Sequence, residues 1–309
     1  MGKYVVRRLL QMIPVILGAT LLLYWLNYAL PSDPAAGRCG DRACSPAYIE
    51  AFSKEYNLDK PFLIQYVLYL GKLLHGDFGT SFMAKSPVIH QLAFRYPTTI
   101  KLAIIALLFQ AIVGIALGIL AGMRKGKLAD NLVILVTLIF ISVPVFVFGG
   151  LAQLIFGIKL KWFPVTVSST PTWYELLLPG LVLGCMSLAY TARLTRTSLV
   201  ENLRADYVRT AKAKGLSTYR VVGIHTLRNS LLPVVTYIGA SFGGLMGGAI
   251  VTERIFNVPG IGNFIYRSIS QHDGNAVVGS VIILVLVYLV VNLIVDLLYG
   301  VLEPRISHD

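Results

Sequence analysis

Six long apolar stretches constrain this chain more than any other feature. They cover residues 9–30, 98–123, 131–157, 176–198, 231–252 and 277–301. An α-helix needs about 20 apolar residues to cross the hydrocarbon core of a membrane. Only 14% of the 309 residues are charged, whereas a soluble domain usually carries about a quarter. The sequence therefore predicts an all-α integral membrane protein with six transmembrane helices.

The distribution of basic residues predicts which way the chain crosses the membrane. If the N-terminus lies inside, the segments on that side hold Lys3, Arg7, Arg8, Arg124, Lys125, Lys127 and the basic residues of 193–229. The segment 31–97, on the opposite side, is longer but less densely basic. Because basic residues concentrate in cytoplasmic segments, we expect both termini inside. The formal net charge of +12 then belongs to loops beside the spans and does not indicate a nucleic-acid partner.

The segment after the first span has two features of its own. Residues 61–74 are apolar and aromatic but too short to span, so they predict a helix that lies along the outer interface or caps the outer end of the bundle. Cys39 and Cys44 flank a Gly-Asp turn on the side predicted to be outside. An oxidising exterior permits a disulfide between them, with two free thiols as the alternative.

The chain carries no recognisable energy source. It has no G-x-x-x-x-G-K-[ST] phosphate-binding loop, and its spans are nearly free of the intramembrane acidic residues typical of ion-coupled carriers. All five histidines lie in loops or tails, which disfavours an enzyme within the membrane. We therefore expect no catalytic residues, no metal site and no cofactor in this chain. Any ATP would be bound by partner subunits.

Small residues recur at helical spacing in two spans. Gly114, Gly118 and Gly122 lie on one face of the second span, and Gly239, Gly243 and Gly247 lie on one face of the fifth. Such faces let helix backbones approach closely. The fifth-span face is predicted either to pack against a neighbouring helix or to line a translocation path.

Two prolines interrupt or open apolar stretches. Pro144 lies within the third stretch and Pro179 near the start of the fourth. A proline inside a helix removes a backbone hydrogen bond and clashes with the preceding turn. Either residue is therefore predicted to kink its helix.

The segment 199–230 is too polar to enter the bilayer, yet its residues favour helices. Tyr207, Ala211 and Lys214 share one helical face, and Val208 shares another with Lys212. Gly215 is expected to end this helix, and Ser217 to cap the next one. The pattern predicts a helix–Gly–helix projection that another protein docks on. The alternative is a solvated basic loop that only serves topology.

This segment resembles the EAA loop of binding-protein-dependent ABC importer permeases, in the form DYVRTAKAKGLS followed by HTLRNSLLPVV. Arg209, Thr210 and Ala211 occupy the position of the EAA triad, and Gly215 that of the family's glycine. Arg228 stands where the general pattern has proline. Four further motifs are similar to those of the B-type permease of dipeptide and oligopeptide importers: the N-terminal YVVRRLLQMIPVILGATLLLY with LPSDP, HGDFGTSF at 75–82, VTERIFNVPGIG at 251–262, and the ending NLIVDLLYGVLEPRI. The Cys39–Cys44 insertion and the short loop after the third span depart from that pattern.

The resemblance implies a type I importer permease fold in a prokaryotic cytoplasmic membrane, with residues 1–97 as first span plus external segment and 98–309 as the transmembrane domain of five spans. It implies a homologous C-type permease, two cytoplasmic ATPases and an extracytoplasmic solute-binding protein as partners, with a peptide as substrate. The ATPase-coupling residues would be Tyr207, Arg209, Thr210, Ala211, Lys212, Lys214, Gly215 and Leu216. The alternatives are import of nickel, glutathione or another small solute by the same architecture, and a carrier that works alone.

Overall fold

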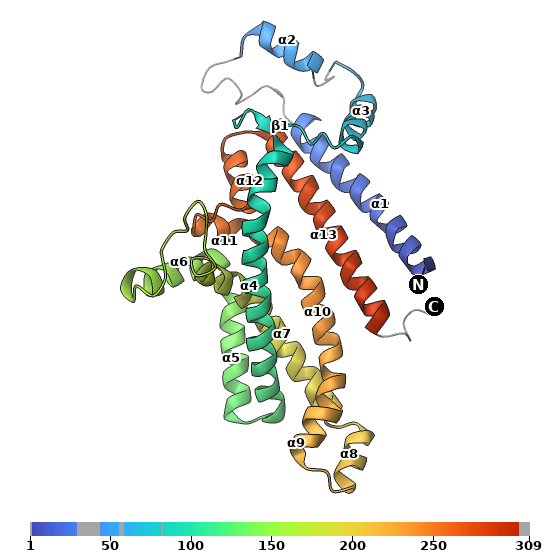
Figure 1. Cartoon of the computed structure of the whole chain (residues 1–309), viewed down its shortest axis with the longest axis vertical. Coiled ribbons are helices and arrows are strands. Elements are labelled where there is room, and N and C mark those ends of the chain that lie inside the picture. Colours follow the sequence, from blue (N-terminus) through green and yellow to red (C-terminus); the bar gives the residue numbers. More distant parts are fainter. Residues whose placement is uncertain (1, 30–43, 56–58, 82, 303–309) are drawn as a thin grey trace.

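The computed structural model describes residues 2–29, 44–55, 59–81 and 83–302, and most of them are helical (Figure 1). The N-terminal elements are α1 (Gly2–Tyr24), the π-helical segment η1 (Trp25–Ala29), α2 (Pro46–Glu55), α3 (Phe62–Leu74), and the short strands β1 (Thr80–Ser81) and β2 (Ser86–Pro87). The middle elements are α4 (Val88–Met123), α5 (Leu128–Ser142), α6 (Val145–Ala152), η2 (Gln153–Lys159) and α7 (Leu177–Asn202). The C-terminal elements are α8 (Asp206–Ala213), α9 (Thr218–Arg220), η3 (Val221–Thr226), α10 (Leu227–Gly248), α11 (Ile250–Ile255), α12 (Ile261–Ser270) and α13 (Gly274–Leu302).

Four of the described helices are long and apolar enough to cross a membrane. These stretches are Val5–Asn27, Val88–Met123, Leu177–Asn202 and Gly274–Leu297, and a fifth is present if α5 and the helix that follows it count as one span. All-helical architecture with four to five candidate spans agrees with the predicted fold class. The predicted fifth span corresponds to α10, which has 22 residues but falls outside this set.

The third apolar stretch does not form the single continuous span that the sequence predicted. The chain breaks between Ser142 and Val145, and the helices on either side meet at 105°. Pro144 is the cause, because the residue before a proline is pushed towards extended backbone. Val143 accordingly has φ −91° and ψ 124°. The Pro144 carbonyl then begins α6 by accepting hydrogen bonds from Val147 and Phe148. The predicted kink at Pro144 is thus confirmed. Pro179, in the first turn of α7, occupies a position that tolerates proline.

The bundle is built around the close pairing of α4 with α7. A Cβ added to Gly114 would lie 2.9 Å from Cβ of Thr191, and one added to Gly122 would lie 2.9 Å from Cδ2 of Leu199. Between them, Gly118 faces Thr195 even more closely. The packing role predicted for these three glycines is therefore confirmed.

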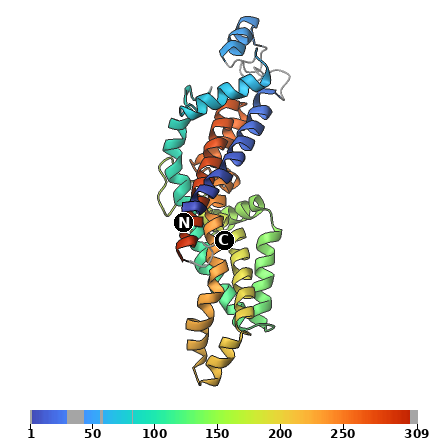
Figure 2. The same ribbon diagram turned by 90° about the vertical axis from the view of Figure 1, so that its right-hand side faces the viewer.

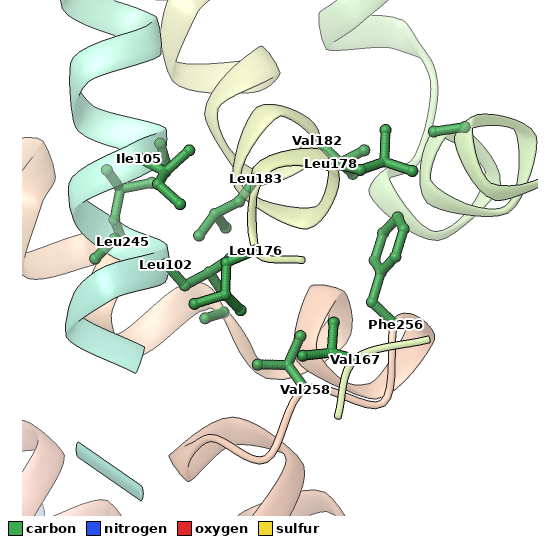
Figure 3. Packing of buried hydrophobic residues seen from close by; sticks show 14 residues of the cluster. Leu102, Ile105, Val167, Leu176, Leu178, Val182, Leu183, Leu245, Phe256 and Val258 are labelled. Carbon is green, nitrogen blue, oxygen red and sulfur yellow. The ribbon is translucent and has the colours of Figure 1, made fainter. Parts of the chain in front are cut away.

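The main hydrophobic core lies in the half of this helix pair that is farther from α8 and α9. Leu102 and Ile105 of α4 meet Leu176 and Leu183, and Phe256 and Val258 from the segment after α11 close the cluster (Figure 3). The core thereby joins α4 and α7 to the short helices that follow α10. α4 itself runs without a break through residue 97, so the predicted division of the chain at 97/98 stays a prediction.

The first helix is attached mainly to the last. α1 and α13 run side by side (Figure 1), and Nε of Arg8 lies 3.2 Å from Oδ2 of Asp296. The predicted helix at 61–74 is present as α3, which crosses the end of α1 (Figure 2). There the Tyr66 hydroxyl donates to the Leu17 carbonyl oxygen at 2.9 Å. α3 has no buried residue, and Leu63 is 72% exposed. One side of α3 therefore caps α1 while its apolar side remains open.

Candidate functional site

The segment predicted to dock a partner projects from one end of the molecule. In both views α8 and α9 lie beyond the ends of α7 and α10, at the opposite end from α2 and α3 (Figures 1 and 2). The turn between α4 and α5, which carries Arg124, Lys125 and Lys127, lies towards the same end. The helix–Gly–helix prediction is confirmed in its geometry, with α8 before Gly215 and α9 after Ser217.

Gly215 ends α8 in a way that few other residues can. Its φ is +74°, in the left-handed region where a Cβ is unfavourable. The Gly215 N–H donates to the Lys212 carbonyl at 2.9 Å, and the Leu216 N–H donates to the Ala211 carbonyl at 3.3 Å. These two bonds make a Schellman motif, which satisfies carbonyls that a helix end would otherwise leave open. The turn after α8 is therefore fixed by backbone geometry.

A small apolar cluster holds the projection together. Val208, Ala211 and Val221 are buried against one another, with Leu216 packed beside them. Val221 lies on η3, so the cluster joins both sides of the Gly215 turn. The sequence pattern predicts that Ala211 shares a face with Tyr207 and Lys214, whereas the structure turns Ala211 inward beside Val208. Sequence spacing allows both groupings, and the contact with Val221 decides between them.

The opposite side of α8 is exposed and basic. Tyr207, Arg209, Thr210, Lys212, Lys214 and Gly215 are all accessible, and Leu216 is half-buried. The Arg209 side chain is 78% exposed and lies 3.7 Å from Asp206, itself 98% exposed. Such an exposed pair contributes little to stability, so these charges remain available to a partner. Of the eight predicted coupling residues, seven thus lie on or beside the accessible surface, and Ala211 supports them from within.

Several polar contacts that the sequence reading missed anchor the projection to the bundle. The Tyr207 hydroxyl donates to Oδ1 of Asn202 at 2.9 Å, and Nδ2 of Asn202 donates to the Ser198 carbonyl at 2.9 Å. Six residues before Asn202, Arg196 of α7 forms two hydrogen bonds with the buried Asp130 of α5, at 2.5 and 2.7 Å. The projection therefore connects stiffly to α7, and through α7 to α4 and α5. The residues involved are far apart in sequence, and no local pattern marks them.

The remaining predicted residues lie away from the projection. Gly243 packs against α13, because a Cβ there would lie 2.9 Å from Cδ2 of Tyr288. Gly239 is half-buried on the same helix, and the surroundings of Gly247 lie outside the described residues. Cys44 is disulfide-bonded. Cys39 lies outside the described residues, so the bridge between Cys39 and Cys44 stays a prediction.

Fold and site together define a multi-spanning membrane protein with a helical projection at one end. Residues 114–308 match the model of the family described as binding-protein-dependent transport system inner membrane component, and residues 1–103 match the model of its N-terminal region. The chain belongs to this family. It is accordingly a multi-pass inner-membrane permease component of a transport system that works with a binding protein.

Individual relatives align over the full length of the chain. It is 36% identical to the di/tripeptide transport system permease protein DppB of Pseudomonas aeruginosa and to the dipeptide transport system permease protein DppB of Escherichia coli K12. It is 37% identical to the glutathione transport system permease protein GsiC of Pectobacterium atrosepticum. The alignments cover 100% of this chain and 99%, 99% and 100% of the respective relatives.

Proposed function

We propose that this chain forms, with a homologous C-type permease, the membrane pathway of an ABC importer for di- and oligopeptides. Two cytoplasmic ATPases would bind the projection at residues 203–217, and an extracytoplasmic solute-binding protein would deliver the substrate. The peptide substrate is inferred from relatives named for dipeptides, for di- and tripeptides, and for glutathione, which is itself a tripeptide. Nickel import is not favoured by these names.

The observation that carries the proposal is the construction of the projection. It has its own buried cluster, a glycine-fixed turn and a basic outer surface. A loop that only served topology would need none of these. A rigid body at the end of α7 and α10 can instead transmit the movement of a bound ATPase into the bundle. In this scheme the projection transfers force and catalyses nothing.

The proposed topology has six spans with both termini in the cytoplasm. α1, α4, α5, α7, α10 and α13 alternate in direction along the chain (Figure 1). The Arg8–Asp296 pair joins the N-terminal part of α1 to the C-terminal part of α13. This contact supports a topology with both termini on the same side of the membrane. The basic turn 124–127 and the basic projection lie towards one end, as expected for the cytoplasmic side. α10 completes the count as the fifth span, which packs against α7 and α13.

Uptake of a labelled dipeptide into cells that express the complete importer tests the proposal. Uptake should stop when ATP is depleted and continue when the proton gradient is collapsed. The reverse result would indicate an ion-coupled carrier that works alone and would overturn the proposal.

A charge-reversal variant tests the docking surface itself. Arg209→Glu combined with Lys212→Glu should lower uptake severalfold and reduce co-purification of the ATPases, because acidic groups on a partner would now be repelled. Single reversals should do little, since exposed ion pairs contribute about 0–1 kcal/mol each. Lys159→Glu, at the end of η2 and also exposed, is the matched control. Equal co-purification of the ATPases with the double variant and the control would refute docking at this surface.

A further inference from the structure

A polar pocket of about 260 Å³ lies between α4, the segment that leads to α7, and the connection between α11 and α12. Its polar lining comes from Arg95, Ser168, Ser169, Asn257, Asn263 and Arg267. The elements that form it lie towards the end of the molecule away from α8 and α9 (Figure 1). In the proposed topology the pocket therefore belongs to the extracytoplasmic half of the protein.

The two arginines of this pocket are held in place by neutral groups. Nη1 of Arg95 donates to the carbonyl oxygen and to Oε1 of Gln91, both at 2.7 Å, and its guanidinium lies 4.5 Å from the ring centre of Phe264. Nη2 of Arg267 donates to Oδ1 of Asn257 at 2.9 Å. These contacts orient both guanidinium groups without neutralising either charge.

The two carboxyl groups near the pocket, those of Glu253 and Glu175, accept hydrogen bonds from residues other than the two arginines. Glu253, beneath the pocket floor at Gly260, accepts hydrogen bonds from Thr99 at 2.7 Å and from the Asn263 N–H at 2.9 Å. Glu175, which follows the pocket residue Ser168 by seven positions, accepts hydrogen bonds from Thr172 and Ser168. The bond from the Thr172 backbone N–H is the main reason that the pKa of Glu175 is lowered. Over the described ranges of the chain, neither Arg95 nor Arg267 forms an ion pair.

We propose that this arginine pocket is a binding site for a carboxylate group. Two guanidinium groups in one small pocket repel each other, and an anion between them removes that cost. A planar carboxylate matches the fork of N–H donors that arginine presents, and the volume admits one amino-acid residue rather than a folded segment. The two candidate sources of the group rest on the proposed function: the C-terminus of an arriving peptide and an acidic side chain of the docked binding protein. Carboxylate binding itself does not depend on that function.

A pair of small probes tests the site directly. N-acetyl-dialanine carries a free carboxylate, and N-acetyl-dialaninamide is neutral but otherwise nearly the same. Saturation-transfer NMR on the purified importer complex in nanodiscs should detect binding of the acid and not of the amide. Arg267→Gln and Arg95→Gln should each weaken binding of the acid by about tenfold, the usual effect of losing one charge-assisted hydrogen-bonded partner.

Arg254→Gln is the matched control. Arg254 lies 4.7 Å from the ring centre of Tyr266, in the same region and with the same kind of aromatic contact as Arg95, but it does not line the pocket. It should bind the acid like the parent protein. Arg95 is half-buried, so removing its charge could disturb the fold. Arg95→Lys keeps the charge and loses only the forked N–H donors of the guanidinium group. Equal binding of acid and amide, or no weakening in Arg267→Gln beyond that of the control, would overturn the proposal.

Two further measurements assign the source of the carboxylate. If the binding protein supplies it, Arg267→Gln should weaken association of the binding protein with the nanodisc complex and reduce the salt dependence of that association. If the peptide supplies it, association should be unchanged, and the concentration of peptide needed for half-maximal uptake should rise. Both results support the carboxylate site, and a variant that changes neither quantity contradicts its role in transport. Uptake that does not depend on ATP would instead refute the proposed function. The probe measurements would still test the carboxylate site in that case.

Discussion

Arg196 of α7 binds Asp130 of α5 through two hydrogen bonds, from Nε to Oδ1 at 2.5 Å and from Nη2 to Oδ2 at 2.7 Å. The Gly126 N–H adds a third bond to Asp130 at 2.8 Å. Asp130 is 1% exposed, so its charge depends on these partners. The pair fixes the turn between α4 and α5 against the helix that leads into the projection.

Replacing Asp130 with Asn should therefore destabilise the protein by about 2 kcal/mol, because the half-buried Arg196 would lose its counter-charge. The melting temperature of the purified protein in detergent measures the effect. Glu50→Gln is the control, since its ion pair with Lys54 is about 70% exposed on both sides and its loss should cost less than about 0.5 kcal/mol. The double variant Asp130→Asn/Arg196→Gln should recover part of the loss. Equal melting temperatures for Asp130→Asn and Glu50→Gln would contradict the structural role of the pair.

Gly215→Pro should abolish coupled uptake while leaving membrane insertion intact. Proline holds φ near −65°, whereas Gly215 has φ +74° and donates its N–H to Lys212. Gly215→Ala should have a smaller effect of about 1 kcal/mol on the turn. Gly76→Ala is the control, because Gly76 has φ +78° and equally open surroundings but lies near α3. Normal uptake by Gly215→Pro at normal expression would show that the turn is not needed for coupling.

Ala211→Glu should disrupt the projection, because the structure buries this side chain, which the sequence alone did not show. The side chain is 8% exposed and packs against Val208 and Val221, so a glutamate there would place a charge inside the cluster. The expected result is local unfolding of the projection, measured as faster trypsin cleavage at Arg209, Lys212 and Lys214. Thr210→Glu, one residue earlier and exposed, should not increase cleavage. If both variants resist trypsin like the parent, the buried position of Ala211 is refuted.

The difference between the two readings of Ala211 shows where sequence reasoning reaches its limit. Gly215 and Pro144 were predicted correctly because their effects act on their own backbone and need no partner. Which side of α8 packs inward, by contrast, depends on its contact with Val221 on the other side of the turn. Arg196 and Asp130 are separated by 66 positions, so no spacing rule connects them. The predicted count of six spans stays a prediction, since four to five stretches of the described residues qualify as candidate spans. Apolar length alone also cannot show the bend after Ser142.

Gly118→Ala should destabilise the bundle although alanine is the better helix former. The added Cβ would collide with the side chain of Thr195 and lie 2.6 Å from the carbonyl oxygen of Ala192. α4 and α7 would have to separate, at a cost of about 1–3 kcal/mol. Gly18→Ala on α1, where a Cβ meets nothing within 4 Å, should leave stability unchanged or raise it slightly. Thermal unfolding in detergent compares the two, and an equal response would argue against close packing at Gly118.

Glu253→Gln should cost about 1–2 kcal/mol of stability, because a buried carboxamide cannot replace both acceptors of the carboxylate. Oε1 accepts from the Thr99 hydroxyl and Oε2 from the Asn263 N–H. Thr99 in turn accepts from the Ile261 N–H at 3.0 Å. The amide group of glutamine would place N–H donors against one of these donors and leave it unpaired. Thr99→Val breaks the same network from α4 and should cost a similar amount.

Because both variants disrupt one network, their effects should not add. The double variant Glu253→Gln/Thr99→Val should be less destabilised than the sum of the singles, as is usual for residues in direct contact. Glu50→Gln makes the same chemical change on an exposed carboxylate and should shift the melting temperature little. Full additivity of the first pair would mean that Thr99 and Glu253 act separately. In that case their hydrogen bond would not be what holds α4 to the segment from α11 to α12.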